Sequence, residues 1–203
     1  MKIIGINGNP GSGKTTASNI LFKDDSKKVI HLDDIFNDIK ELLPKRNTDT
    51  FKTGDSEAII LNRKGALYKV LNSKVINKEF VLAKKIYANK YLKYVIKKAY
   101  KEGIDYIVIE GVHLENYDIT YLIDYFIFIE ANEEDRVDRL IKRDAEYANI
   151  IFKKSLNMSD SIDKSKYDFI LENNGSLENF KDSCDEISKN IKNNSAKVKK
   201  IKL

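Results

Sequence analysis

Two kinds of apolar pattern alternate along the chain. Short continuous runs rich in Ile and Val predict buried β-strands, whereas longer segments with an apolar residue every three or four positions predict amphipathic helices. The strand-like runs lie at residues 2–7, 27–32, 106–111 and 125–129, and residues 167–175 predict a last strand followed by a turn. Because helical segments separate these runs, the sequence predicts an α/β fold, with a parallel sheet of about five strands flanked by helices.

Two helical regions interrupt this core pattern. Residues 58–101 predict two or three helices, and with the polar loop before them they form a helical insert over about residues 44–102, expected to cover a second substrate. Another helix begins after Asn132, the expected N-cap, and has an acidic first turn that suits the helix dipole. We expect the region from about residue 133 to 165 to act as a lid.

Composition and charge indicate one domain. Residues 1–191 are expected to form it, ending in a helix that starts after the N-cap Ser176, and the basic residues 192–203 are expected to be a flexible tail. The net charge of +5 at pH 7 suits anionic ligands and does not demand nucleic acid. The single cysteine, Cys184, excludes a disulfide framework and is expected to pack in the core. With no apolar stretch long enough to cross a membrane, these features predict a cytoplasmic location.

The stretch Gly8–Thr15, between the first predicted strand and the first predicted helix, fits the phosphate-binding P-loop pattern G-x-x-x-x-G-K-[ST] at every fixed position. Glycines leave the backbone N–H groups open to a polyphosphate, Lys14 brings an ammonium to the β- and γ-phosphates, and Thr15 offers a hydroxyl to Mg²⁺. The residues expected to contact the nucleotide here are Gly8, Asn9, Pro10, Gly11, Ser12, Gly13, Lys14, Thr15 and Thr16.

Acidic residues follow two of the predicted strands. Asp33 and Asp34 come after the second strand, and Glu110 ends the third. Carboxylates at the carboxyl ends of parallel strands lie where open α/β sheets bind ligands. We expect Asp33 to orient and deprotonate an acceptor hydroxyl, and Thr15, Asp33 and Glu110 to hold Mg²⁺. The alternative is that the aspartates cap a helix over residues 35–43; Asp34 in particular is expected to cap it or to lie beside the acceptor.

Basic side chains supply the other candidates. Arg136, Arg139 and Arg143 share one helix face, where Arg139 and Arg143 are expected to close over the transferring phosphate; Arg136 is the weaker candidate, and salt bridges to nearby acids are the alternative. Arg63 and His113 are expected to contact the acceptor. The lysines interleaved with tyrosines before residue 101 are interpreted as a solvated helix face, and His31 as a strand residue that is not a ligand.

Taken together, these segments resemble the P-loop kinases of small molecules. The resemblance to dephospho-coenzyme A kinase lies in Gly8–Thr15, the two aspartates, the Arg139 and Arg143 helix, and residues 168–175. In that family the last segment lies near the adenine of ATP, which assigns Asn173 to nucleotide binding. The resemblance to uridine kinase lies in residues 32–36, 109–111 and 124–129.

The resemblance implies an ATP- and Mg²⁺-dependent transfer of the γ-phosphoryl group to a hydroxyl of a small nucleoside-containing metabolite. Dephospho-coenzyme A is the first expected acceptor, which would place the chain in coenzyme A biosynthesis, and uridine is the second. Neither family fits throughout: the acceptor-domain His-Pro of the former and the lid arginines that follow Arg-Asp in the latter are absent. Two other classes stay open, namely a regulatory ATPase without an acceptor and a kinase of nucleic-acid ends.

Overall fold

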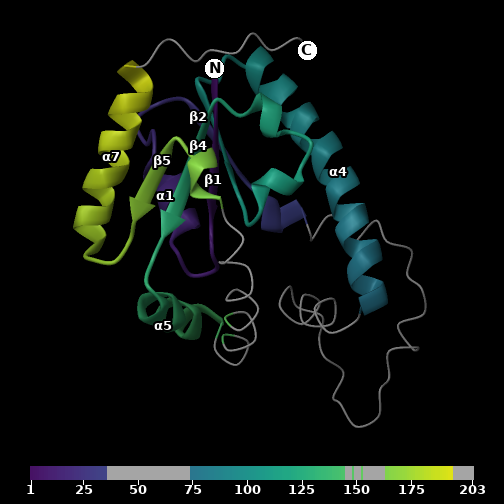
Figure 1. Cartoon of the computed structure of the whole chain (residues 1–203). Helices are drawn as coiled ribbons and strands as arrows, with labels where there is room; N and C mark the ends of the chain where they lie inside the picture. Colours follow the sequence, from purple (N-terminus) through teal and green to yellow (C-terminus); the bar gives the residue numbers. More distant parts are fainter. Residues whose placement is uncertain (36–73, 145–147, 149–151, 153–162, 194–203) are drawn as a thin grey trace.

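A computed structural model describes residues 1–35, 74–144, 148, 152 and 163–193 of the chain (Figure 1). Its core is a five-stranded sheet in the order β2-β3-β1-β4-β5, and every neighbouring pair of strands is parallel. The strands are β1 (Lys2–Gly8), β2 (Lys27–His31), β3 (Tyr106–Glu110), β4 (Tyr125–Glu130) and β5 (Phe169–Glu172). The predicted α/β fold with a parallel sheet of about five strands is confirmed.

Helices cover both faces of the sheet, because the strands carry apolar side chains on both sides. On one face, α1 (Lys14–Ile20) and α7 (Leu177–Asn193) pack in one apolar cluster with residues of β1, β3, β4 and β5. On the other face lies α4 (Lys74–Lys101), whose buried residues are Ala88, Leu92, Val95, Ile96 and Ala99. Figure 1 shows α4 and α7 on opposite sides of the sheet.

The helix α4 packs on the core of the sheet. Its residues Ala88, Leu92, Val95, Ile96 and Ala99 share one apolar cluster with Ile3, Ile107 and Ile109 of the central strands, and the role of the insert over a second substrate stays a prediction. The apolar stripe is therefore a core face, as its spacing indicates, and the lysine-rich positions lie outside it. Residues 36–73, which include the rest of the predicted insert, lie outside the described residues.

Two predicted caps set the ends of the remaining helices. The Asn132 Oδ1 accepts from the Asp135 N–H at 2.8 Å and starts α5 (Glu133–Asp144), and the Ser176 Oγ accepts from the Asn179 N–H at 3.2 Å and starts α7. Both caps are confirmed. The helix α7 runs two residues past the predicted end at Ile191, and its Lys192 pairs with Asp25 at 2.6 Å.

Short 3₁₀ turns and side-chain bonds connect the strand ends. The turns η2 (Leu114–Asn116) and η3 (Thr120–Leu122) follow β3, and η5 (Lys164–Lys166) precedes β5. The Asp124 carboxylate accepts from the Ile3 N–H at 2.8 Å, which fixes the start of β4 beside β1. Cys184 is buried as predicted. Among the helices that the structure describes, none has both the length and the hydropathy needed to cross a bilayer.

Packing of α4 on the sheet generates a stability prediction. The side chain of Ile96 is 0% exposed, whereas Ile86, on the same helix, is 51% exposed. We expect Ile96→Ala to lower the free energy of unfolding by about 2–5 kcal/mol, because it leaves a cavity, and Ile86→Ala to lower it by less than about 1 kcal/mol. Urea unfolding followed by circular dichroism measures both. Equal losses would contradict the packing of α4 as a core helix.

Candidate active site

The P-loop connects the end of β1 to the start of α1, at the carboxyl edge of the sheet. Three of its glycines have positive φ, namely Gly8 at 153°, Gly11 at 80° and Gly13 at 104°. The packing around them is as restrictive as the backbone. A Cβ on Gly8 would lie 2.6 Å from the Ile129 carbonyl oxygen, one on Gly11 would lie 2.7 Å from the Arg136 carbonyl oxygen, and one on Gly13 would strike the Asn173 amide. Close contact with the protein, as well as access for phosphate, therefore requires glycine here.

The ammonium of Lys14 lies inside the loop. Its Nζ donates to the carbonyls of Gly8 at 2.9 Å and Asn9 at 3.1 Å. Burial lowers the pKa of Lys14, and the carboxylates of Glu110 and Asp33 oppose that shift. The charge of Lys14 is thus surrounded by oxygen atoms and by two acidic groups, at the place where the sequence predicts phosphate.

The predicted metal ligands Thr15 and Glu110 lie together. The Thr15 Oγ1 donates to the Glu110 Oε1 at 3.2 Å, and Glu110 is buried at the end of β3. An alcohol and a carboxylate oxygen so close are a donor set that suits Mg²⁺, which takes few protein ligands and binds phosphate oxygens. In the described ranges, no group of three or more His, Cys, Asp or Glu residues could hold a metal ion by itself.

His31 lies in a strand, as the sequence predicts; it is the last residue of β2, and its partner is Glu110. Its Nδ1 lies 2.7 Å from the Glu110 Oε1, and the two residues are register partners at the ends of β2 and β3. Neighbouring parallel strands place such partners side by side on one face of the sheet. The sequence contains no signal for this pair, since the pairing of β2 with β3 is a property of the strand order.

Asp33 and Asp34 lie just beyond β2, and both are exposed. Residues 32–35 are helical, so this helix begins earlier than predicted and the aspartates occupy its first turn, not its N-cap. Asp33 is close enough to act electrostatically on Lys14 and on the buried Tyr117, whose pKa is raised by burial and then by this charge. The structure therefore brings Asp33 to the predicted phosphate site.

The arginines of α5 contact the P-loop backbone. The Arg136 Nε donates to the Pro10 carbonyl at 3.1 Å, and the Arg139 guanidinium donates to the Gly11 carbonyl at 3.4 Å. Arg136, the weaker candidate in the sequence, is buried, whereas Arg143 is exposed and acts on Lys14 electrostatically. Figure 1 shows α5 beyond the carboxyl ends of the strands.

Asn173 joins the same group of contacts from the end of β5. Its Nδ2 donates to the Ser12 carbonyl at 2.8 Å, and its backbone carbonyl accepts from Arg139 at 2.8 Å. Asn173 is buried beside the P-loop, and its assignment to nucleotide binding stays a prediction. Thr16 is exposed on α1, one residue past the P-loop pattern, and Arg63 lies outside the described residues.

A second polar group, the Asn7 cluster (Asn7, His113, Glu115 and Tyr167), lies at the end of β1. The Asn7 amide is 1% exposed, donates to Glu115 at 2.7 Å and to the Tyr167 hydroxyl at 2.6 Å, and accepts from the N–H groups of Gly8 and His113. The His113 Nδ1 lies 2.9 Å from the Glu115 Oε1. Burial alone would raise the pKa of Glu115, but the hydrogen bond from His113 and others outweigh it and lower the pKa.

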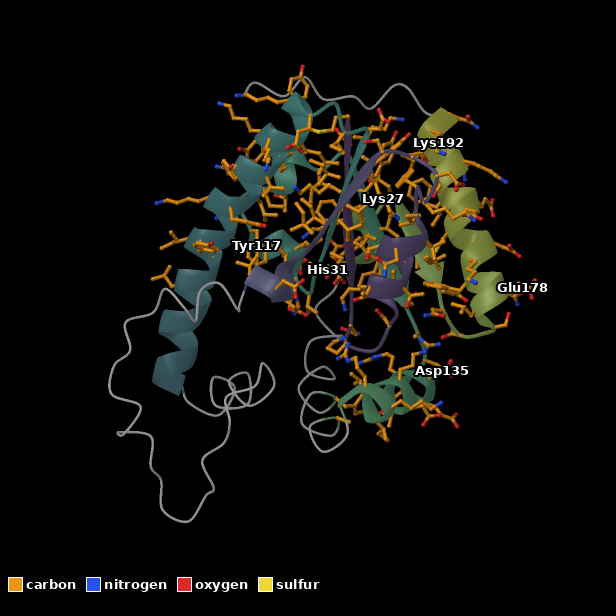
Figure 2. All side chains as sticks on the ribbon, turned by 180° about the vertical axis from the view of Figure 1, so that it is seen from behind. Lys27, His31, Tyr117, Asp135, Glu178 and Lys192 are labelled. Carbon is orange, nitrogen blue, oxygen red and sulfur yellow. The ribbon has the colours of Figure 1, made fainter. Side chains whose placement is uncertain are left out.

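Of this cluster, sequence reasoning singled out only His113. Asn7 and Tyr167 are 160 residues apart, and no local pattern connects them. The one available signal is a polar Asn7 at the end of an otherwise apolar central strand, where a buried amide needs partners for all its hydrogen-bonding groups. Figure 2 labels His31, the last residue of β2, whose side chain pairs with Glu110 at this edge of the sheet.

The fold and this site define the class of P-loop small-molecule kinases. The resemblance predicted from the sequence is confirmed, and the chain belongs to the family described as "AAA domain", whose pattern matches residues 4–156. The chain is 29% identical over 150 residues to the uridine kinase of Clostridium novyi, an alignment that covers 70% of this chain and 67% of that protein.

Solved structures support the same fold. TT1252 from Thermus thermophilus superposes with a TM-score of 0.69 and 19% identity, and covers 94% of this chain and 97% of that chain. Dephospho-CoA kinase from Campylobacter jejuni superposes with a TM-score of 0.59 and 20% identity, and covers 94% of this chain and 98% of that chain.

The glycine contacts generate a prediction with a matched control. Gly13 and Gly103 both have positive φ, but a Cβ on Gly103 would meet nothing within 4 Å. We expect Gly13→Ala to weaken ADP binding by about tenfold or more, because Asn173 must move away from the loop. Gly103→Ala should lower the free energy of unfolding by about 1 kcal/mol from backbone strain and leave ADP affinity unchanged. Calorimetric titration with ADP measures the difference; equal affinities would show that the packing around Gly13 has no effect on the site.

Proposed function

We propose that the chain transfers the γ-phosphoryl group of ATP to a hydroxyl of a small nucleoside-containing metabolite. The observation that carries the proposal is the group of side chains at one edge of the sheet: Lys14 lies inside the P-loop, Thr15 donates to Glu110 at 3.2 Å, and the exposed Asp33 acts electrostatically on Lys14. A nucleotide-binding switch needs the P-loop, but it does not need a carboxylate such as Asp33 exposed beside the phosphate site. Phosphoryl transfer to a second substrate needs such a group.

Each group has a role in this reaction. The acceptor oxygen forms a bond to the γ-phosphorus, the bond from that phosphorus to the bridging oxygen of ADP breaks, and the hydroxyl proton passes to the Asp33 carboxylate. Lys14 leaves the carbonyls of Gly8 and Asn9 and pairs with the phosphate oxygens.

Thr15 and Glu110 would hold Mg²⁺, which supplies positive charge to the transferring group. Arg143 is exposed on α5 and acts electrostatically on Lys14, so its guanidinium adds positive charge around the transferring group.

The Asn7 cluster supports a place for the acceptor. It lies next to Gly8, on the same face of β1 as Ile3, which is the face that α4 covers. The side chains of His113 and Glu115 are partly exposed. With Glu115 ionised, the His113 Nδ1 carries the proton and the Nε2 of a neutral ring can accept a hydrogen bond from an acceptor hydroxyl or amide. Asp34 stays a proposed acceptor contact, and so does Arg63, which lies outside the described residues.

The comparisons favour a pyrimidine nucleoside as the acceptor. The relative from Clostridium novyi is a uridine kinase at 29% identity. The likeness to the dephospho-CoA kinase rests on 20% identity and supports the fold alone. We therefore propose uridine as the first acceptor. Dephospho-coenzyme A stays the second, because residues 168–175 resemble the corresponding segment of dephospho-coenzyme A kinase.

The acceptor is tested by ADP release from Mg·ATP with one compound at a time. We expect release to depend on uridine or cytidine and to be accompanied by a product one phosphoryl group heavier. Dependence on dephospho-coenzyme A alone would support the second acceptor, and dependence on a 5′-hydroxyl oligonucleotide would support a nucleic-acid kinase. Hydrolysis at the same rate without any acceptor would replace the kinase with a regulatory ATPase.

The role of Asp33 is tested by Asp33→Asn. The amide cannot take the hydroxyl proton, so we expect the transfer rate to fall by about 10²–10⁴-fold while ADP affinity stays the same. The neighbouring Asp34→Asn, which removes the same charge one residue away, is expected to keep the rate within about tenfold and to act mainly on the acceptor KM. Steady-state kinetics and ADP titration measure both variants. A fully active Asp33→Asn enzyme would remove Asp33 from the proposed base position.

A further inference from the structure

The backbone carbonyls of the P-loop form an uninterrupted series of hydrogen-bond acceptors for side chains. Lys14 occupies the first two from inside the loop. The next three are occupied by donors from α5 and from the end of β5, which we call the outer brace (Arg136, Arg139 and Asn173). The pairs are Arg136 Nε to Pro10 at 3.1 Å, Arg139 Nη1 to Gly11 at 3.4 Å and Asn173 Nδ2 to Ser12 at 2.8 Å.

The outer brace determines the direction of the loop amides. All peptide bonds of the described residues are trans, so a C=O and the N–H of the following residue lie in one plane and point in opposite directions. Donors on the carbonyls of Pro10 and Ser12 therefore direct the N–H groups of Gly11 and Gly13 away from the brace. The Ser12 N–H between them closes a turn on the Asn9 carbonyl at 3.1 Å.

The brace is itself fixed. Arg136 is 5% exposed and Asn173 is 8% exposed, so neither changes position without disturbing packed neighbours. The Asn173 N–H bonds to the Glu130 carbonyl at 2.8 Å, and its own carbonyl accepts from the Arg139 Nη2 at 2.8 Å. Arg139 thus contacts both the loop and Asn173. These contacts join β4, β5 and α5 to one side of the P-loop.

Close packing supports the same arrangement. The space next to the Cα of Gly11 is filled by the backbone of Arg136, and the space next to the Cα of Gly13 is filled by the Asn173 side chain. The loop therefore has no room to turn its outer carbonyls inward while the brace is in place. A carbonyl that pointed inward would repel a phosphate oxygen. Because the brace already holds the carbonyls outward in the folded chain, the loop loses its conformational freedom on folding and not on binding.

We propose that Arg136, Arg139 and Asn173 are positioning residues that preset the phosphate-binding amides of Gly11 and Gly13 by holding the loop carbonyls from outside. They act through the backbone and not by contact with phosphate. The inference rests on the proposed nucleotide binding but is independent of phosphoryl transfer and of the acceptor.

Asn173→Ala tests the inference, because it removes a donor without changing the charge of the site. The matched control is Asn174→Ala, in the same turn, whose side chain accepts from the Asn132 N–H and is not bonded to the P-loop. The probe is inorganic tripolyphosphate, which has no adenine and so reports on the loop alone. We expect Asn173→Ala to weaken its binding by about tenfold, as for the loss of one well-placed hydrogen bond, and Asn174→Ala to leave it unchanged.

Two further measurements separate positioning from general destabilisation. Arg139→Lys keeps the charge and loses the fork that spans Gly11 and Asn173, so we expect a several-fold weaker binding of tripolyphosphate that persists at high salt. Nuclear magnetic resonance relaxation of the Gly13 amide, measured without tripolyphosphate, should show added motion in Asn173→Ala and none in Asn174→Ala.

Wild-type affinity and an unchanged Gly13 amide in Asn173→Ala would overturn the inference, as would equal losses of affinity in the two asparagine variants. If the wild-type protein bound neither tripolyphosphate nor ADP, the proposed function would fail together with the inference; binding without turnover would remove only the kinase proposal.

Discussion

The ammonium of Lys14 is buried at the carboxyl end of the central strand, where water cannot solvate it fully. Its burial lowers its pKa, and the nearby carboxylates of Glu110 and Asp33 favour the charged form. Such a group is stable only if oxygen atoms surround it, and the carbonyls of Gly8 and Asn9 supply them. In the proposed reaction, phosphate oxygens take the place of these carbonyls.

The parallel sheet explains how acidic and basic groups from distant segments meet there. All five strands end at one edge, and β1 lies between β3 and β4. The P-loop therefore has Glu110 and His31 to one side and the β4–α5 and β5–α7 connections to the other. An antiparallel neighbour would place the start of a strand at this edge and would separate these groups.

Local patterns in the sequence predict most of the elements, and the spatial neighbours are harder to predict. The strand ends differ from the predictions by one or two residues, and the Asn132 and Ser176 caps form as expected. The partners of His31 and Asn7 were missed, because they depend on the order of the strands and on contacts between segments far apart in the chain. The contact of Arg136 with the loop was underrated for a similar reason: helical spacing predicts which residues share a face, but it does not predict what that face meets.

The P-loop glycines show how one pattern can have two physical causes. From the sequence, their absence of side chains is explained by access for a polyphosphate on the inner side of the loop. The structure adds contacts with Ile129, Arg136 and Asn173 on the other side, and a single Cβ would disturb them even without a ligand. The glycines thus allow the loop to be packed closely between α5 and β5. In the proposed nucleotide binding, a loop held in this way binds an anion without first losing conformational freedom, and the surrounding elements act on the site through the loop backbone.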